Sequence, residues 1–240
     1  MIIKAPIDLE LTQNSGQTSQ PPWKLDNNIY SDVVVADNKA VLFQVKQKEN
    51  NLDFNFIGDI SNKEATKKIK TIFDLDFNLN KFYKYLNNQP ELVDMTNFCR
   101  DLRLFLAKDK FECVISSVCS ANNSIVRWTK SIDDIKKSWG NKYTYSEKDY
   151  FTFPDVSDFK NIYCDDVEEF ECCSNLNNPG ECINNLKSCG VGYRAPYMKK
   201  ASEIFTLEMD LDDISKMSYD EAFDTMLKVP GVGPKVADCI

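Results

Sequence analysis

The chain has 240 residues, of which 42% are apolar, enough for a sizeable hydrophobic core in one domain or two small ones. Its 29 basic and 37 acidic residues give a net charge of −8, which argues against a protein that coats nucleic acid by bulk attraction but not against a local basic site. No run approaches the ~18 apolar residues of a membrane span, and the N-terminus resembles neither a secretory signal nor a transit peptide. We therefore expect a protein that stays inside the cell and does not contact a membrane.

The first sixty residues read as β structure. Short runs rich in β-branched and aromatic residues, separated by D-N-K and K-E-N-N turn signals, predict strands at 32–35, 41–47 and 52–57. Leu52, Phe54 and Phe56 alternate with polar residues, as in a strand with one buried face. These runs predict an antiparallel sheet.

The hydrophobic period changes at Asn62. Ile69, Ile72 and Phe73 begin a helical stripe, and further helices are expected at 82–86 and 93–102. A sheet followed by helices is an α+β arrangement. We predict an N-terminal antiparallel sheet domain with one helix at 1–85 and a helical domain at 86–240.

A pair of helices is predicted in the middle of the chain. Apolar residues at i, i+3, i+4 and i+7 from Phe111 predict a buried helix over 111–119, and A-N-N-S at 121–124 interrupts it. A second apolar stripe runs through Ile125, Trp128, Ile132 and Ile135 to Gly140, a candidate C-cap. Taken alone, the Asn-Asn break is typical of a helix–helix turn.

Nine cysteines, an odd and scattered number, indicate reduced thiols rather than a disulfide framework. Five of them lie close together in the sequence: Cys164, Cys172, Cys173, Cys182 and Cys189. Their spacing matches no paired C-x-x-C pattern, and the chain contains no histidine. We expect no metal and no cofactor, and interpret this segment as an inserted polar loop.

The last residues, V-P-G-V-G-P-K-V-A-D-C-I at 229–240, predict a hairpin between two helices, with the whole motif at 218–240. Ser218 is the candidate N-cap of the first helix and Glu221 completes a capping box. Gly231 and Gly233 would let the loop approach a sugar-phosphate backbone closely, and Pro234 suits the first position of the second helix.

That second helix has few residues. Only six remain from Lys235 onward, fewer than the ~11 of an average helix, so Val236, Cys239 and Ile240 are expected to have little to pack against. We therefore expect the chain to be an incomplete gene product.

Three segments occur in the order and rough spacing of eukaryotic 8-oxoguanine DNA glycosylases: C-S-A-N-N-S-I-V-R at 119–127, V-G-Y-R-A at 191–195 and P-G-V-G-P-K-V-A-D-C at 230–239. A weaker fourth match is N-S-G-Q at 14–17, followed by Trp23. The chain resembles this family along nearly its whole length, with an apparent insertion around 168–186. The resemblance implies a monomeric base-excision repair enzyme that acts on double-stranded DNA containing oxidised guanine, in the nucleus or the mitochondrion.

The resemblance also assigns residues to the extrusion of the damaged nucleotide. Extrusion costs a few kcal/mol of stacking and pairing, so the vacated space must be filled. By resemblance, Asn122 enters that space and Tyr193 is the wedge beside it. Arg127 and Arg194 resemble the pair that reads the cytosine opposite the lesion. Without the motifs, both arginines would be interpreted as surface cations.

Lys235 is the candidate nucleophile. Its neutral amine would attack the sugar C1′ as the damaged base leaves, giving a Schiff base that permits strand cleavage by β-elimination. The amine must first lose its proton, which desolvation and the positive end of a helix both favour. The alternative is a lysine that only binds phosphate, as in non-catalytic modules with this motif.

For the base pocket, the resemblance places Cys239 against one face of the flipped purine. It also assigns to the carbonyl of Gly16 the sensing of the N7 proton that distinguishes 8-oxoguanine from guanine. An unpaired buried acceptor costs ~1–3 kcal/mol, which is enough for useful discrimination.

The chain departs from the family in lacking the aspartate of a V-D-x-H stretch beyond the second helix. Asp238 cannot simply substitute, because it lies three residues from Lys235 on the same short helix. We expect the chain as given to be weakly active or inactive. Two alternatives stay open: an endonuclease-III-like or adenine-specific glycosylase, expected to carry an iron-sulfur cysteine cluster after the hairpin, and a non-catalytic module that binds damaged DNA.

Overall fold

The computed structural model describes residues 1–16, 20–36, 38–162, 164 and 185–240. It contains two compact units, one formed by residues 1–18 and 22–108 and the other by residues 19–21 and 109–240. Helices α3 (Leu79–Asn87) and α4 (Met95–Phe98) thus belong to the same unit as the N-terminal sheet. Within the described part of the chain, no helix is long and apolar enough to cross a membrane.

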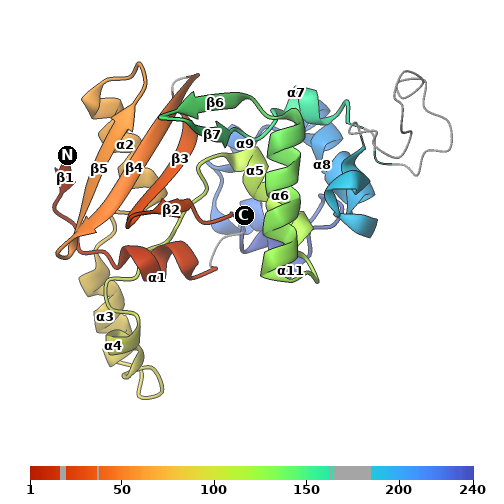
Figure 1. The fold of residues 1–240 in the computed structure, drawn as a ribbon. Coiled ribbons are helices and arrows are strands. Elements are labelled where there is room, and N and C mark those ends of the chain that lie inside the picture. Colours follow the sequence, from red (N-terminus) through yellow and green to blue (C-terminus); the bar gives the residue numbers. More distant parts are fainter. Residues whose placement is uncertain (17–19, 37, 163, 165–184) are drawn as a thin grey trace. The chain divides into compact units, whose positions relative to one another are not determined.

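The first unit is built on a five-stranded antiparallel sheet of order β1-β5-β4-β3-β2 (Figure 1). Its strands are β1 (Ile2–Ile3), β2 (Lys24–Asp26), β3 (Ile29–Ala36), β4 (Lys39–Lys48) and β5 (Asn51–Ile57). Val45 faces Phe54 across the β4–β5 pair, and both side chains are buried. The three predicted strands and their antiparallel pairing are confirmed.

Two helices complete this core. Helix α1 (Leu9–Asn14) is capped by Asp8, and α2 (Asn62–Ile72) begins with a capping box formed by Ser61 and Glu64. The buried residues of α2 join the core formed by the sheet, and Phe73 at the C-terminal end of α2 packs its ring 5.4 Å from that of the buried Trp23. The helix expected after Asn62 is confirmed.

The helix predicted at 82–86 lies within α3 and is confirmed. The prediction of a helix at 93–102 is wrong beyond Phe98, where α4 ends. The reason is a set of long-range hydrogen bonds. Asp101 has a positive φ of 61°, and its N–H donates to the Tyr83 hydroxyl at 2.7 Å. The buried Arg103 guanidinium donates to the carbonyls of Pro6, Asp74 and Phe77 at 2.8–2.9 Å.

The second unit is helical. Its elements, in chain order, are α5 (Lys110–Ser120), α6 (Ile125–Trp139), β6 (Lys142–Tyr145), β7 (Lys148–Phe151), α7 (Val156–Phe159), the 3-10 turns η3 (Leu186–Cys189) and η4 (Gly192–Arg194), α8 (Ala195–Leu207), α9 (Leu211–Ile214), α10 (Tyr219–Met226) and α11 (Pro234–Ala237). Every side chain of α5 from Phe111 to Cys119 is buried, as expected. Helix α6 ends at Gly140 as predicted, where the Thr152 carbonyl leaves no room for a Cβ. The β6–β7 hairpin was not predicted.

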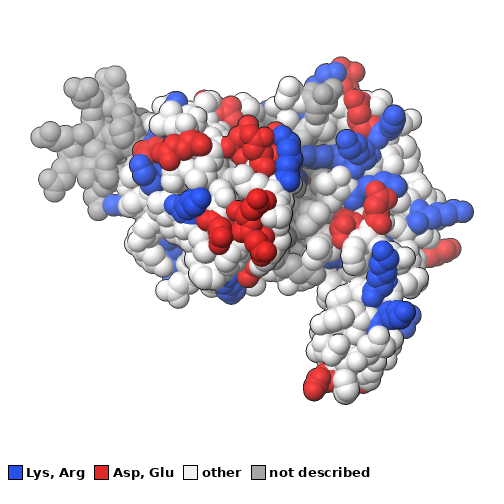
Figure 2. All heavy atoms as spheres, turned by 180° about the vertical axis from the view of Figure 1, so that it is seen from behind, with Lys and Arg blue, Asp and Glu red and all other residues white. Residues whose placement is uncertain are grey.

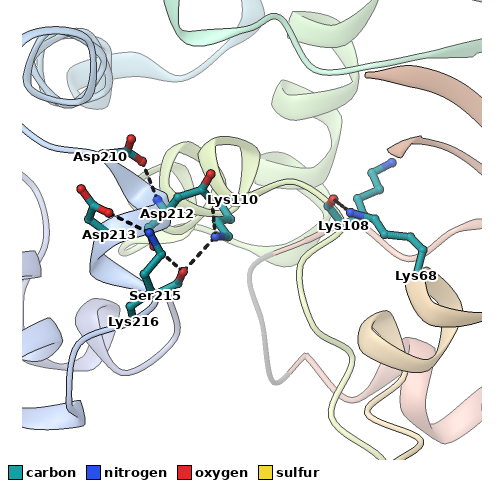
Figure 3. Close-up of polar contacts among 8 residues, drawn as sticks. All are labelled: Lys68, Lys108, Lys110, Asp210, Asp212, Asp213, Ser215 and Lys216. Carbon is teal, nitrogen blue, oxygen red and sulfur yellow. Dashed lines mark hydrogen bonds and ion pairs between the residues drawn. The ribbon is translucent and has the colours of Figure 1, made fainter. Parts of the chain in front are cut away.

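An ion pair and a hydrogen bond connect the start of α5 to α9 within the second unit. The Lys110 ammonium binds Asp212 of α9 at 2.5 Å and donates to the Ser215 hydroxyl at 3.0 Å, while Lys216, just beyond the end of α9, pairs with Asp213 (Figure 3). Figure 3 also shows a bond inside the first unit, from the Lys68 ammonium to the Lys108 carbonyl at 3.1 Å.

A buried ion pair joins α5 to α6. Lys136 contacts the carboxylate of Glu112, and their side chains are only 9% and 2% exposed. Burying either charge alone is costly, so each depends on the other.

Replacing Lys136 with Met should lower the free energy of unfolding of the second unit by about 3–5 kcal/mol, because Glu112 would be left buried without a counter-charge. The matched control is the double variant Glu112→Gln/Lys136→Met, which keeps no charge at the site and should lose less. Urea denaturation followed by tryptophan fluorescence measures both. Equal losses in the two variants would contradict the role of the pair.

Candidate functional site

The C-terminal motif folds as a helix, a tight hairpin and a second short helix. Ser218 caps α10, and the Glu221 carboxylate accepts a hydrogen bond from the Ser218 N–H at 3.0 Å, so the predicted capping box is present. Helix α11 then starts with Pro234 at its first position, because that position needs no N–H donor and proline already has a helical φ.

The two hairpin glycines have different surroundings. Gly231 has a φ of +85°, and a Cβ built on it would lie 2.9 Å from Tyr197 Cβ and 3.2 Å from Val118 Cγ1. Gly233 has a φ of −97°, and a Cβ there would meet open space. At Gly231 the hairpin backbone therefore packs directly on α5 and α8, whereas at Gly233 no neighbouring atom covers the place where a side chain would lie.

Lys235 is exposed in α11, and its ammonium makes no hydrogen bond or ion pair with any residue that the structure describes. Its neighbour on the helix, Asp238, accepts a hydrogen bond from the Tyr219 hydroxyl at 2.5 Å, and this bond raises the pKa of Tyr219. Asp238 is thus paired with α10, and the Lys235 amine is free to meet a ligand.

The expectation that Val236 has little to pack against was wrong. Its side chain is partly buried against the core of the second unit, and Ala237 beside it is fully part of that core. The reason is that the core extends through the hairpin to α11, with Val229 and Val232 both buried.

The turn between α5 and α6 has a defined hydrogen-bond pattern. Asn123 Nδ2 donates to the Cys119 carbonyl at 3.1 Å, closing α5, and Ser124 caps α6. Asn122 lies between Ala121, the C-cap of α5, and Ser124, with a φ of +50°, and its exposed side chain has no hydrogen-bond partner among the described residues. Asn122 is the turn residue whose amide group is left available.

Arg194 reaches this turn from η4. Its Nε and one terminal nitrogen donate to the carbonyls of Ala121 and Asn122, each at 2.7 Å, and its other terminal nitrogen donates to the Val191 carbonyl at 3.3 Å. The guanidinium carbon lies 4.5 Å from the ring centre of Tyr193, which is 60% exposed. The structure therefore brings Asn122, Tyr193 and Arg194 together.

The two predicted arginines differ in environment. Arg194 is only 8% exposed, whereas Arg127 is exposed on the first turn of α6 and its guanidinium has no partner among the described residues. That both arginines read an opposing cytosine stays a prediction.

Sequence reasoning missed an exposed apolar pair at the start of α6. Ile125 was expected in the buried stripe, but it is 68% exposed, and Val126 is 79% exposed. Both follow directly after the Asn122 turn, where none of the described elements of the second unit covers the helix. The signal that could have identified these two residues as exposed is their position on the first turn of the helix, because this turn protrudes beyond the core that the later turns contact.

Of the predicted base-pocket residues, Gly16 belongs to the first unit and Cys239 to the second. Gly16 is exposed with a φ of +67°, and Gln17 of the same match lies outside the described residues. Nearby, the buried Trp23 donates its backbone N–H to Gln13 Oε1 at 3.0 Å. Cys239 is half-buried, and the Cys113 thiol lies 3.8 Å from its carbonyl.

The inner thiols of the second unit are shielded from water. Burial raises the pKa of Cys113 to about 12, and those of Cys119 and Cys189 to about 11. Cys172, Cys173 and Cys182 lie outside the described residues, as does most of the predicted insertion. Over the described part of the chain, no group of three or more cysteine or acidic residues could hold a metal ion.

The surface charge is mixed. On the face that Figure 2 presents, acidic and basic side chains lie interspersed, in keeping with the net charge of −8. Binding of a polyanion would thus depend on local donors rather than on that face as a whole.

Comparisons with known proteins identify close relatives. The N-terminal domain model of 8-oxoguanine DNA glycosylase matches residues 1–114. A probable N-glycosylase/DNA lyase of Methanothermobacter thermautotrophicus is 42% identical over 97% of this chain and 74% of its own length. The N-glycosylase/DNA lyase of Saccharomyces cerevisiae is 25% identical over the full chain, which spans 63% of that protein.

A solved structure shares the fold. It is the Clostridium acetobutylicum 8-oxoguanine glycosylase/lyase in complex with double-stranded DNA containing cytosine opposite 8-oxoguanine. The TM-score is 0.74 at 26% identity, over 100% of this chain and 76% of that one. The predicted α+β class, an antiparallel sheet followed by helices, is confirmed.

Substituting Ala for Gly231 should lower the free energy of unfolding by about 1–3 kcal/mol, because the new Cβ would meet Tyr197 and φ is positive. Gly233→Ala is the matched control and should change stability by less than about 0.5 kcal/mol. Thermal denaturation of the two variants tests this. Similar losses would show that Gly231 is not a packing constraint.

Iodoacetamide at pH 8 should alkylate Cys99 and Cys239 before Cys113, Cys119 and Cys189. With a pKa of about 12, only about one Cys113 thiol in 10,000 is a thiolate at that pH, and the side chain is buried. Mass spectrometry of the native protein gives the order of labelling, and labelling in urea, where the difference should vanish, is the control. Equal rates in the native protein would contradict the burial of α5.

Proposed function

The chain belongs to the 8-oxoguanine DNA glycosylase/lyase family, and from this we propose that it excises 8-oxoguanine opposite cytosine from duplex DNA and cleaves the strand at the resulting site. The observation that carries the proposal is Lys235. It is an exposed amine, free of partners among the described residues, on the helix that follows a hairpin of the family's sequence.

In the proposed reaction the Lys235 amine, after losing its proton, attacks the sugar C1′ as the bond to the damaged base breaks. The base leaves with the bonding electrons and takes up a proton. The sugar ring opens to a Schiff base, and loss of a C2′ proton expels the 3′ phosphate by β-elimination. Lysine is suited to this step because it supplies both the nucleophile and the nitrogen of the imine.

The proposed extrusion of the nucleotide uses the Asn122 turn. The exposed amide of Asn122 would fill the gap left in the stack, and the exposed ring of Tyr193 would lie against the neighbouring base pair. Arg127 is the exposed guanidinium available to read the opposing cytosine. The contacts of Arg194 with both segments support a single DNA-binding surface formed by these residues.

Two duplexes distinguish base removal from the reaction of the amine. One carries a preformed abasic site opposite cytosine, and its reaction requires only the amine. The other carries 8-oxoguanine, and its reaction also requires base removal. We expect borohydride to trap a covalent adduct on the abasic duplex through Lys235, and Lys235→Gln to abolish it. Lys228→Gln, an exposed lysine just before the hairpin, is the matched control and should trap like the wild type.

Peptide mapping of the adduct identifies the reactive lysine. An adduct on another lysine, or full trapping by Lys235→Gln, would overturn the nucleophile. Selective binding of damaged duplex without any adduct would indicate a non-catalytic module, and preference for adenine opposite the lesion would overturn the substrate.

A further inference from the structure

The guanidinium of Arg194 is buried against backbone rather than extended toward solvent. Three of its nitrogens donate to the carbonyls of Ala121, Asn122 and Val191, and the side chain belongs to a residue that is 8% exposed. The planar fork of arginine donors suits this use, because it can meet two neighbouring carbonyls at fixed angles.

Two of these carbonyls have a special position. The Ala121 carbonyl belongs to the peptide plane before the Asn122 Cα, and the Asn122 carbonyl to the plane after it. The relative orientation of those two planes is set by φ and ψ of Asn122, which in turn set the direction of its side chain. Both planes are held by one rigid group at 2.7 Å.

Asn122 needs such support. Its φ of +50° lies in the left-handed region, which costs an L-residue about 1 kcal/mol or more, although asparagine tolerates it better than most. Its side chain is exposed and makes no hydrogen bond to described residues, so nothing in the side chain itself fixes the turn.

The same guanidinium also contacts Tyr193. Its central carbon lies 4.5 Å from the ring centre, within the range of a cation–π interaction. One buried cation thus contacts both the turn that carries Asn122 and the ring of Tyr193.

We infer that Arg194 is a positioning residue: it fixes the backbone on either side of Asn122 and the ring of Tyr193 before DNA binds, so that the gap-filling amide and the wedge are already in place. This inference rests on the proposed function. It differs from a role in reading the cytosine, because its effect is independent of the opposing base.

Equilibrium binding to duplexes carrying a tetrahydrofuran abasic analogue distinguishes the two roles. The analogue is placed opposite cytosine in one duplex and opposite a second tetrahydrofuran in the other. We expect Arg194→Ala to weaken binding to both duplexes about tenfold, since the unpaired carbonyls release the turn. Arg127→Ala should weaken mainly the cytosine duplex. A loss by Arg194→Ala confined to the cytosine duplex would overturn the inference.

A double-mutant cycle with Asn122→Gly provides a second readout. Glycine keeps the positive φ of the turn but removes the side chain that Arg194 is inferred to aim. In that background the further loss caused by Arg194→Ala should shrink to about twofold or less. Losses that simply add would show that the two residues act separately.

Arg194→Lys keeps the positive charge but cannot bridge both carbonyls as a planar fork. We expect it to bind damaged duplex nearly as poorly as Arg194→Ala, and wild-type binding by Arg194→Lys would overturn the inference. Lys200→Ala on α8 is the surface control, and thermal unfolding confirms that each variant is folded. If the wild type neither binds damaged duplex selectively nor forms an adduct, the proposed function fails instead.

Discussion

The close packing of the buried helix α5 is the constraint on which the rest of the helical unit depends. At its start, Glu112 can be buried only because Lys136 neutralises it from α6. Near its end, Val118 receives the hairpin at Gly231, where no side chain fits. Immediately after it comes the turn that Arg194 holds. A helix buried on all sides thus orients the hairpin and the Asn122 turn through contacts that tolerate little movement.

What could be predicted from the sequence was what short-range patterns determine. The strands follow from alternation along the chain, and the capping box at Ser218 follows from residues three positions apart. The end of α4 at Phe98 and the burial of Arg194 depend instead on carbonyls far away in the sequence. The burial of Ile125 was wrongly predicted because its helical periodicity is correct, while no described residue packs over that end of α6 to bury it.

An acidic chain can still bind a polyanion if its donors are local and preorganised. At physiological ionic strength the Debye length is roughly 8 Å, so charges of the chain that lie farther than this from DNA repel it only weakly. In the proposed function, the groups available at contact are the exposed cations Arg127 and Lys235 and the open backbone beside Gly233. The composition therefore excludes binding by bulk attraction, and leaves binding by shape and a few placed donors.

The two arginines of the site show how environment divides roles that sequence alone leaves equivalent. Arg127 has no partner among the described residues, so contact with a base would cost it only its hydration. For Arg194 to make the same contact, it would have to leave the carbonyls of Ala121 and Asn122, each of which would then need another donor at a cost of ~1–3 kcal/mol. The turn would also lose the group that holds its peptide planes at the step in which, in the proposed function, Asn122 enters the DNA duplex. If Arg127 reads the cytosine and Arg194 holds the turn, as we propose, the two roles do not compete for the same donors.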